Sequence, residues 1–333
     1  MALDHFVSQV YLKNFYSPKM GNLMYAIRKS DLKPFTPNSQ SVCRIEEGNT
    51  NSYLREDRIV EEFLENIEPR YNNALAKLIH DNIDQECIFV IAGFIAYVST
   101  CSPAAMRIHS EILQVFVEET AKKISSKRTL RPPPIDLGGK NLYDYLENKN
   151  IRMKVNPKFP QAVGITEILN ITKQYGNYDW DILINPFNDS PFFTSDFPIA
   201  IECTEKLHVH NLIIPLAPDV SVRIRSNHTS KQEQKDYSFS GFQRTIQKLN
   251  RTEVKTINRL IVRCAETMVF FRDQYEWISN FVKKNACFRI KTRTQKVADN
   301  KGGLLWNIVE IAKITEQMHE HMTPKSRDLI DIQ

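Results

Sequence analysis

Residues Cys87–Val98, with the sequence CIFVIAGFIAYV, form the most apolar run of the chain. The run has twelve residues, whereas a helix that crosses a bilayer needs about twenty. We therefore predict a helix that is buried in a protein core, and no membrane partner.

Helical patterns lie on both sides of this run. Over residues 59–79, apolar residues recur every three or four positions along one face, which indicates an amphipathic helix. On the other side, a Ser-Pro pair suits the start of a helix over 102–123. At the N-terminus the pattern predicts a short helix over 4–16 and then a strand over 23–28.

A Pro- and Gly-rich segment over residues 131–139 is the clearest break in the chain. Beyond it, runs rich in β-branched and aromatic residues alternate with helical patterns. Strands are predicted over 180–185, 199–203, 212–216, 221–226, 267–272 and 288–296, and helices over 160–175, 244–265, 274–285 and 305–321. We expect a mixed α/β (α+β) fold in which a mainly helical region, 1–130, packs on a mixed-sheet region, 140–333, within a single domain.

The composition excludes some classes of protein without indicating a function. With 333 residues, 42% hydrophobic and 25% charged, the chain is neither disordered nor of low complexity. Its net charge of +5 is compatible with a nucleic-acid partner. The N-terminus lacks a signal-peptide pattern, and the six cysteines form no CxxC pair, so we expect a cytoplasmic protein with reduced thiols. No P-loop, GxGxxG, GxSxG or HExxH motif is present.

Two polar residues stand out in the predicted first helix. His5 and Gln9 are four residues apart and so would share one face. An imidazole and an amide on one face can orient a phosphate or a metal-bound water. The alternative is an ordinary exposed helix start with Asp4 near the N-cap, and on these residues alone it is the better explanation.

The predicted helix over 59–79 carries an acidic stripe, in which Glu61, Glu65 and Glu68 follow the helical repeat. Gathered carboxylates can hold a divalent cation, or raise one another's pKa for acid–base catalysis. A solvated helix flank explains such a stripe equally simply and is the commoner case.

The segment 192–198, FFTSDFP, places three short polar residues inside an aromatic, strand-like run. Asp196 would be desolvated there and would need a hydrogen-bond or cationic partner, as a functional carboxylate does. The alternative is a structural turn in which Thr194, Ser195 and Asp196 cap backbone amides. The sequence leaves both interpretations open.

Two predicted strands carry rows of basic residues. Arg289, Lys291 and Arg293 alternate along one strand, and Arg223 and Arg225 along another. Such rows match surfaces that neutralise phosphates. They are also typical of the solvated face of an edge strand, where charge discourages aggregation, and each row taken alone favours this explanation.

The opening segment, DHFVSQVYLKNF, resembles the start of the domain-of-unknown-function family 4238. Further segments resemble motifs of that family in the same order: Val60-Glu61 with Ile67-Glu68, the Thr-Ser-Asp-x-Pro motif at 194–198, Pro215-Leu216-Ala217-Pro218, and Ile257-Asn258 with Ala265. The resemblance spans residue 4 to about residue 272. The chain departs from the family pattern where Ser8 replaces a proline and where Cys101-Ser102-Pro103 replaces an Arg-containing turn.

The resemblance changes the weight given to these polar residues. It implies that His5, Gln9, Glu61, Glu68 and Asp196 belong to one shared site, since all fall on positions that the family pattern singles out. Similar proteins occur among candidate single-gene anti-phage systems of bacteria, which implies a defence effector. The family's activity is not established.

Our leading hypothesis is therefore an anti-phage nuclease or related phosphodiesterase that acts on nucleic acid. Glu61, Glu68 and Asp196 would bind Mg²⁺ or Mn²⁺ or supply the general base, and His5, positioned by Gln9, would be the general acid or a phosphate ligand. Candidate binding residues are Tyr11, Thr194, Ser195, Asn258, Arg223, Arg225, Arg289, Lys291 and Arg293. The alternative is a non-catalytic sensor or binding module that recognises a phage protein, the possible trigger, or a nucleic acid.

Overall fold

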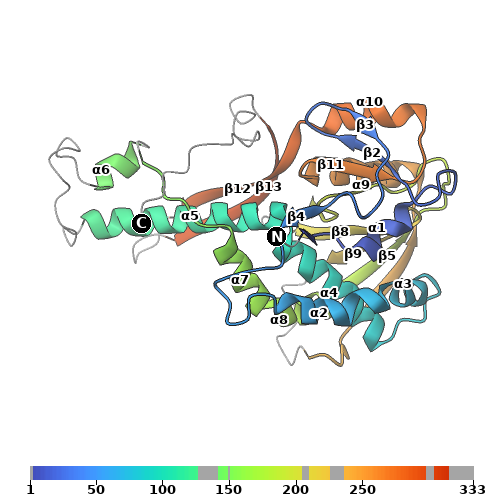
Figure 1. The fold of residues 1–333 in the computed structure, drawn as a ribbon, viewed down its shortest axis with the longest axis horizontal. Coiled ribbons are helices and arrows are strands. Elements are labelled where there is room, and N and C mark those ends of the chain that lie inside the picture. The colour runs from blue at the N-terminus through green and yellow to red at the C-terminus, as the bar shows by residue number, and fades with distance from the viewer. Residues whose placement is uncertain are drawn as a thin grey trace.

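The fold is built around helix α4 (Gln85–Cys101), which contains the apolar run, as Figure 1 shows for the computed structural model. Asp84 caps the helix by accepting a hydrogen bond from the amide of Cys87 at 2.8 Å. Thirteen of its seventeen residues are buried, so the helix is covered on all sides. The predicted core helix is confirmed.

The structure describes residues 3–126, 142–148, 151–204, 210–225, 236–297 and 304–314. The predicted break at 131–139 lies outside these residues. The remaining helices are α1 (Gln9–Leu12), η1 (Lys13–Phe15), α2 (Val60–Ile67), η2 (Glu68–Arg70), α3 (Tyr71–Ile79), α5 (Pro103–Ser126), α6 (Leu142–Glu147), α7 (Lys158–Thr166), α8 (Ile168–Gly176), α9 (Arg251–Cys264) and α10 (Glu276–Asn285). The single helix predicted over 59–79 is divided at Pro69, which has no N–H to continue an α-helix and lies in the short 3₁₀ turn η2.

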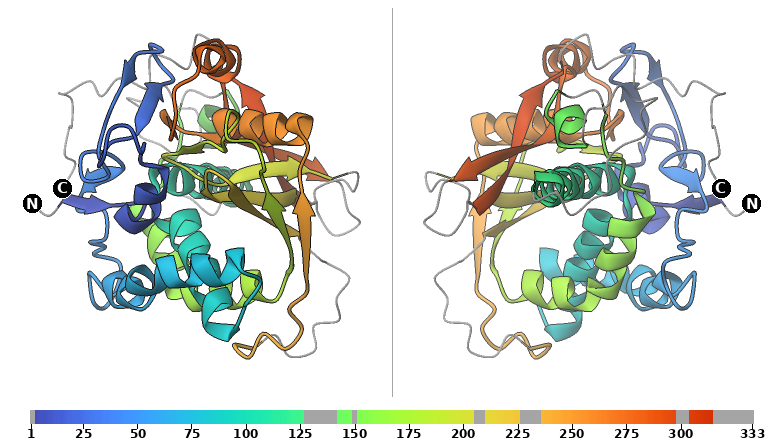
Figure 2. Two further views of the ribbon diagram at one scale, coloured as in Figure 1. Left: turned by 90° about the vertical axis from the view of Figure 1, so that its right-hand side faces the viewer. Right: turned by 90° about the vertical axis from the view of Figure 1, so that its left-hand side faces the viewer.

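The larger sheet has the strand order β10-β5-β9-β8-β7. Its strands are β5 (Asp179–Ile184), β7 (Ala200–Cys203), β8 (His210–Ala217), β9 (Val220–Arg225) and β10 (Arg244–Lys248). β10 runs parallel to β5, and the other neighbours are antiparallel, so the sheet is mixed. In Figure 2 the helices α2, α3, α4, α7 and α8, coloured blue to green, lie below this sheet and α9, in orange, lies above it.

A second sheet pairs strands from the N-terminal region with strands from the second half of the chain, in the order β3-β2-β11-β6. Its strands are β2 (Tyr25–Arg28), β3 (Pro34–Phe35), β6 (Thr194–Ser195) and β11 (Met268–Phe271). Two further pairs are β1 (Leu3–His5) with β4 (Arg44–Glu46), and the hairpin β12 (Phe288–Val297) with β13 (Leu304–Lys313). The mixed α/β class is confirmed, and the N-terminal half contributes strands as well as helices.

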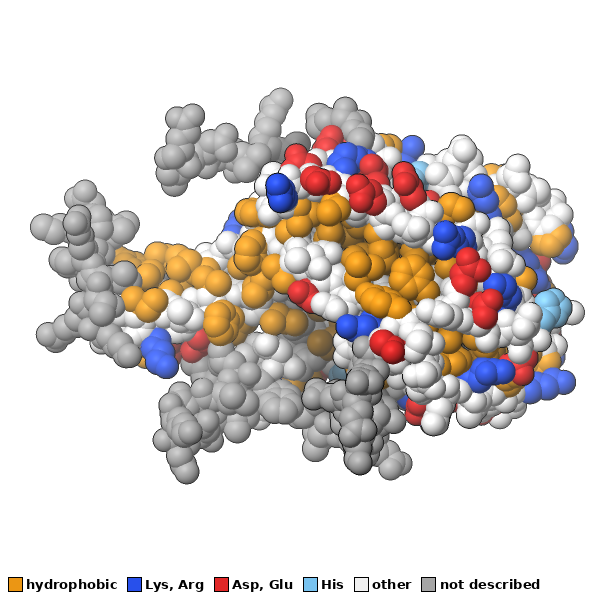
Figure 3. Space-filling model, turned by 90° about the horizontal axis from the view of Figure 1, so that it is seen from below, with side chains coloured by type: hydrophobic (Ala, Val, Ile, Leu, Met, Phe, Trp, Pro, Cys, Tyr) orange, Lys and Arg blue, Asp and Glu red, His pale blue; other side chains and the backbone are white. Residues whose placement is uncertain are grey.

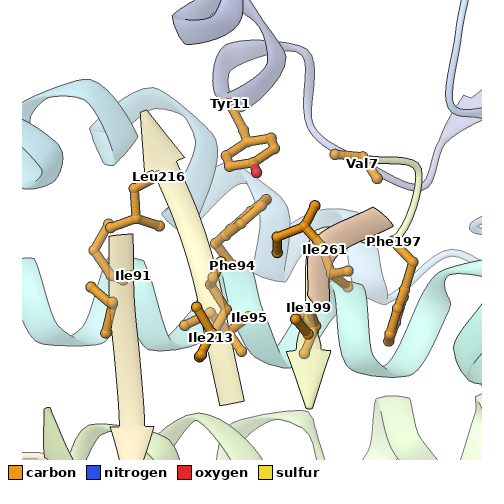
Figure 4. Close-up of a cluster of buried hydrophobic side chains, with 14 of the residues drawn as sticks. Val7, Tyr11, Ile91, Phe94, Ile95, Phe197, Ile199, Ile213, Leu216 and Ile261 are labelled. Carbon is orange, nitrogen blue, oxygen red and sulfur yellow. The ribbon is translucent and has the colours of Figure 1, made fainter. Parts of the chain in front are cut away.

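The core is continuous across the two halves of the chain. Figure 4 shows Phe94 and Ile95 of α4 beside Ile213 of β8, with Tyr11 of α1 and Ile261 of α9 in the same cluster. Burial of apolar side chains from all these elements stabilises the arrangement by roughly 25 cal/mol per Å² removed from water.

Several other predicted elements are wrong in part. The single helix predicted over 160–175 is two helices, α7 and α8. The predicted helix over 4–16 begins as strand β1, and only Gln9–Phe15 is helical. The predicted helix over 244–265 begins at Arg251, because the Asn250–Glu253 capping box starts α9 there and the preceding residues pair with β5 as β10. The part of the predicted helix over 305–321 that the structure describes belongs to strand β13, because β12 offers a full ladder of backbone partners, and residues 315–321 lie outside the described residues.

Among the described residues, no single helix is both long and apolar enough to cross a membrane. The bent pair α4 and α5 passes the same test by length and composition, with a 58° angle at the break between the helices.

Gly176, the last residue of α8, provides a test of core packing. A Cβ at this position would lie 2.4 Å from Cε1 of Phe239, a ring that is itself buried. We expect Gly176→Ala to lower the free energy of unfolding by about 1–3 kcal/mol, although alanine suits a helix better than glycine. The matched control is Gly241→Ala, where no atom lies within 4 Å, and urea unfolding should show no loss for this variant. Equal stability of the two variants would contradict the packing argument.

Candidate functional site

A solvent-open pocket lies where β1 and the start of α1 meet α2 and η2. It has a volume of about 510 Å³. Its lining consists of Leu3, Asp4, His5, Gln9, Asn49, Glu61, Leu64, Glu65, Glu68 and Pro69, and we call it the His5–Glu68 pocket. The structure thus brings together four of the five predicted catalytic residues: His5, Gln9, Glu61 and Glu68.

Strand pairing, rather than a helix face, positions His5. β1 pairs with β4, and the carbonyl oxygen of His5 lies 2.7 Å from the hydroxyl of Tyr97 on α4. Gln9 Nε2 lies 3.5 Å from His5 Nδ1, so a weak hydrogen bond orients the ring. When Gln9 donates to Nδ1, the proton of a neutral imidazole is on Nε2. Nε2 is buried and has no hydrogen-bond partner in the described part of the chain.

Arg58 ties Asp4 and Glu61 together at one side of the pocket. Its guanidinium lies 2.8 Å from Oδ1 of Asp4, and its Nε donates to Oε2 of Glu61 at 2.9 Å. Asp4 also accepts a hydrogen bond from the amide of Asn49 at 3.0 Å. Burial would raise the pKa of Asp4, but Arg58 and this amide outweigh it and hold the pKa below its usual value.

Glu65 and Glu68 differ from Glu61 in having no ion-pair or hydrogen-bond partner within the described ranges. Glu65 is exposed and Glu68 is half-buried. The lining contains four carboxylates, those of Asp4, Glu61, Glu65 and Glu68, and together with the adjacent Arg58 their formal charge is −4 + 1 = −3. The pocket therefore combines an oriented imidazole with two available carboxylates in an acidic surrounding.

Asp196, the fifth predicted catalytic residue, does not line this pocket. Its Oδ1 accepts a hydrogen bond from the amide of Glu266 at 3.0 Å, and its Oδ2 accepts one from the amide of Thr267 at 2.7 Å. Burial raises the pKa of Asp196, and the hydroxyl and amide of Thr267 and the charge of Lys29 oppose this shift. The carboxylate thus holds the turn before β11.

The structure therefore does not bring Asp196 together with Glu61 and Glu68 as the predicted metal ligands. In the residues that the structure describes, no group of three or more His, Cys, Asp or Glu side chains is arranged to hold a metal ion.

The other predicted binding residues of the family motifs are buried and paired internally. The Tyr11 hydroxyl contacts Thr194 Oγ1 and donates to the carbonyl of Pro215 at 2.7 Å. Ser195 Oγ donates to the carbonyl of Phe197 at 2.6 Å. Asn258 accepts from the amide of Phe193 at 2.9 Å and donates to the carbonyl of Pro191 at 2.9 Å. These side chains connect α1, α9 and the FFTSDFP segment.

The predicted basic rows are largely balanced by acidic neighbours. Arg223 Nε lies 2.9 Å from Glu202, and Arg225 Nε lies 3.3 Å from Asp181 on the adjacent strand. Arg289 is buried, 3.9 Å from Glu266. Lys291 is half-buried and Arg293 is exposed. Cross-strand ion pairs thus account for Arg223 and Arg225 without a bound polyanion.

Two surfaces were missed from the sequence. One is a groove of about 700 Å³ between α9 and α10, lined on α9 by Arg251, Lys255, Arg259 and Arg263. We call it the α9–α10 groove. The four-residue spacing of these cations is visible in the sequence and puts them on neighbouring turns of a helix.

The other is an apolar face on the helical side of the molecule, visible in Figure 3. It includes Tyr53, Ile59, Phe159, Val163 and Leu169, each at least 41% exposed. The signal was available in α7 and α8, whose apolar residues outnumber those needed for one buried face.

A sequence profile of the family described as "Protein of unknown function (DUF4238)" matches residues 4–275. The matched segment includes the His5–Glu68 pocket and α9, and it ends just before α10. No curated protein and no solved structure matches the chain.

Proposed function

The chain belongs to the DUF4238 family, and from this premise we propose that it is a bacterial anti-phage effector that hydrolyses phosphodiester bonds of nucleic acid in the cytoplasm. The observation that supports the proposal is the His5–Glu68 pocket, where two segments about sixty residues apart place an imidazole beside unpaired carboxylates. General acid–base hydrolysis requires such a pair of groups.

Each residue has a distinct role in this proposal. Glu68 takes the proton of the attacking water, because its carboxylate is accessible and unpaired. His5 donates a proton to the leaving oxygen as the imidazolium, which requires the ring to turn so that its buried Nε2 faces the pocket, and Gln9 contacts the ring at Nδ1. Glu61 holds Arg58 and so maintains the shape of the pocket.

The charge of the pocket indicates how a metal ion would take part. A formal charge of −3 repels a phosphodiester, so the substrate must arrive with a cation. Mg²⁺ is commonly bound through one or two carboxylates together with substrate phosphates, without a complete set of protein ligands. Glu65, beside Glu68, has the free oxygens for this, and Mg²⁺ or Mn²⁺ would counter the charge of the phosphate.

We expect Glu68→Gln to lower the cleavage rate by about 10²- to 10⁴-fold, because it removes the base. Its melting temperature should stay near that of the wild type, since the carboxylate has no partner to lose. The measurement is incubation of purified protein with total tRNA, mRNA, plasmid and single-stranded DNA, with Mg²⁺, Mn²⁺ or chelator. Glu62→Gln is the matched control, because Glu62 lies six residues earlier, on α2, is exposed and does not line the pocket.

His5→Ala should also abolish cleavage. Asp4→Asn should instead lower the stability of the fold, because it weakens the pairing with Arg58. Cleavage that survives both Glu68→Gln and His5→Ala would place the chemistry elsewhere. An absence of cleavage by folded wild-type protein, even with phage lysate added, would count against catalysis altogether.

The second candidate is a non-catalytic module that binds a phage protein. It is supported by the apolar face, since contiguous exposed hydrophobic side chains on a soluble surface typically mark protein contacts. In a phage-challenge assay, this candidate requires Val163→Asp with Leu169→Asp to abolish protection while Glu68→Gln retains it. If the protein is a hydrolase, Glu68→Gln should abolish protection.

A further inference from the structure

The α9–α10 groove is strongly cationic. Its lining contains Arg251, Lys255, Arg259 and Arg263 of α9 and Lys284 of α10, against one carboxylate, that of Asp189. The formal charge of the lining is therefore +5 − 1 = +4. A concave surface of one sign concentrates ligands of the opposite sign.

Three of the five cations are available to a ligand. Arg251 is paired with Asp189 at 2.8 Å, and Arg263 donates to Asn285 Oδ1 at 2.8 Å. Lys255, Arg259 and Lys284 have no ion-pair or hydrogen-bond partner within the part of the chain that the structure describes. The two residues at the ends of the α9 row, Arg251 and Arg263, are thus paired with neighbouring side chains. The two residues between them and Lys284 on α10 remain available to a ligand.

The length of the row suits an extended polyanion. Arg251 and Arg263 are twelve residues apart on one helix, which corresponds to about 18 Å at a rise of about 1.5 Å per residue. At a rise of about 3.4 Å per nucleotide, this length accommodates roughly five nucleotides of one strand.

The groove also has an aromatic wall. Trp277 of α10 lines it and is 37% exposed, although indole rings are normally well covered. Its ring stacks on Phe193 at 5.7 Å and meets Phe281 edge-on at 5.6 Å, so neighbouring rings hold it in place. A fixed aromatic ring beside a basic groove is the combination by which proteins bind single strands without reading their sequence.

We propose that the α9–α10 groove binds a single-stranded nucleic acid, with its phosphates along Lys255, Arg259 and Lys284 and a base stacked on Trp277. The inference deepens the proposed function, and it rests on that function in naming the strand as the substrate that the His5–Glu68 pocket cleaves. RNA and single-stranded DNA share the phosphates and bases that this groove recognises, and the two are separate probes in the test.

The test measures binding without turnover. Fluorescence anisotropy is recorded with labelled 12-mer RNA and DNA strands, the Glu68→Gln chain and a chelator. Lys255→Glu with Arg259→Glu should weaken binding by about tenfold or more and lower the slope of log K against log salt by about 1.4, which is 0.7 for each lost phosphate contact. The control, Lys19→Glu with Lys123→Glu, makes the same charge change at exposed positions outside the groove and should bind nearly as the parent does.

The contribution of Trp277 is tested with strands that lack bases. The parent should bind an abasic strand about tenfold more weakly than an ordinary one, and Trp277→Ala should bind both equally. Trp277→Phe, which keeps a ring, should restore part of the difference, and circular dichroism of each variant checks that it is folded.

Three results would overturn the inference: unchanged affinity in the Lys255–Arg259 variant, an equal loss in the Lys19–Lys123 control, or equal affinity for strand, duplex and inorganic polyphosphate. Failure of this inference and failure of the proposed function are distinguishable. Undiminished cleavage by Glu68→Gln with intact strand binding would refute only the pocket. Normal cleavage of a dinucleotide by the groove variant together with unchanged strand affinity would refute only the groove.

Discussion

Arg107→Ala is expected to lower the free energy of unfolding by about 3–5 kcal/mol at pH 7, because it leaves the carboxylate of Glu266 buried without its partner. Arg107 on α5 makes two hydrogen bonds of 2.8 Å to Glu266 and donates to the carbonyl of Ile290 at 3.0 Å. The two side chains are only 19% and 15% exposed. One side chain thus joins the long helix to the turn before β11 and to β12.

Urea unfolding of three variants separates the ion pair from the packing. Arg107→Met with Glu266→Gln removes both charges, so it should be more stable than Arg107→Ala. Arg28→Ala should change stability by about 0.5 kcal/mol or less, because Arg28 and Asp31 form an ion pair that is about half exposed to water. If Arg107→Ala were as mild as Arg28→Ala, the buried pair would not be a main connection of the fold.

The same pair sets an expected pH dependence. Burial would raise the pKa of Glu266, but the hydrogen bonds and charge of Arg107, followed by the charges of Arg289 and Lys29, hold the pKa below its usual value of 4.5. A lowered carboxyl pKa stabilises the fold above the unfolded pKa, and this stability is lost as the pH falls through the folded pKa. The deficit of Arg107→Ala should therefore be largest near neutral pH and shrink below about pH 4.

Asp196→Asn is expected to lower the free energy of unfolding by about 2–4 kcal/mol, because three donors converge on the carboxylate and an amide offers only one accepting oxygen. The amides of Glu266 and Thr267 approach different carboxylate oxygens, so the NH₂ group of an asparagine would face a donor in either orientation. Burial lowers the pKa of nearby Lys29 to about 8, with the charge of Asp196 acting against this shift. Removing that charge would destabilise the buried ammonium further.

Thermal unfolding and cleavage, measured on the same samples, distinguish the two interpretations of Asp196 that the sequence leaves open. A structural carboxylate predicts lower stability and an unchanged cleavage rate per folded molecule. A catalytic carboxylate predicts unchanged stability and a much lower cleavage rate per folded molecule. Asp57→Asn is the control, because Asp57 is exposed, and its unfolding free energy should change by about 0.5 kcal/mol or less.

The candidate site was partly predictable for a reason that can be traced to individual residues. The structure places His5, Gln9, Glu61 and Glu68 around one pocket, as the family resemblance implied, although the predicted helix for His5 and Gln9 is wrong. Gln9 still reaches His5 because the turn between β1 and α1 keeps the two side chains on one side of the chain. Asp196 was grouped with them because the family pattern singles out all five positions, but its carboxylate serves a buried turn instead of an open site.

The α9–α10 groove shows the opposite case. The row from Arg251 to Arg263 can be read from the helical repeat, but Trp277 and Lys284 come from another helix. Nothing local to either helix indicates that the two faces meet, since the approach is set by the burial of Val254, Ile261 and Phe281 beneath them.

The local sequence was sufficient to predict an element when the residues of that element themselves carry the signal for its structure. The apolar run of α4 requires burial on every side. The Asn250–Glu253 capping box is a local signal for the start of α9, although the predicted helix ran back to residue 244. Long-range packing alone decided that Leu304–Lys313 is a strand, that Asp196 lies apart from Glu68, and that the α9 cations face Trp277. The reason is physical. A helix forms its backbone hydrogen bonds within one segment, whereas a strand needs a second segment to pair with, and a pocket or groove needs a second segment to line it.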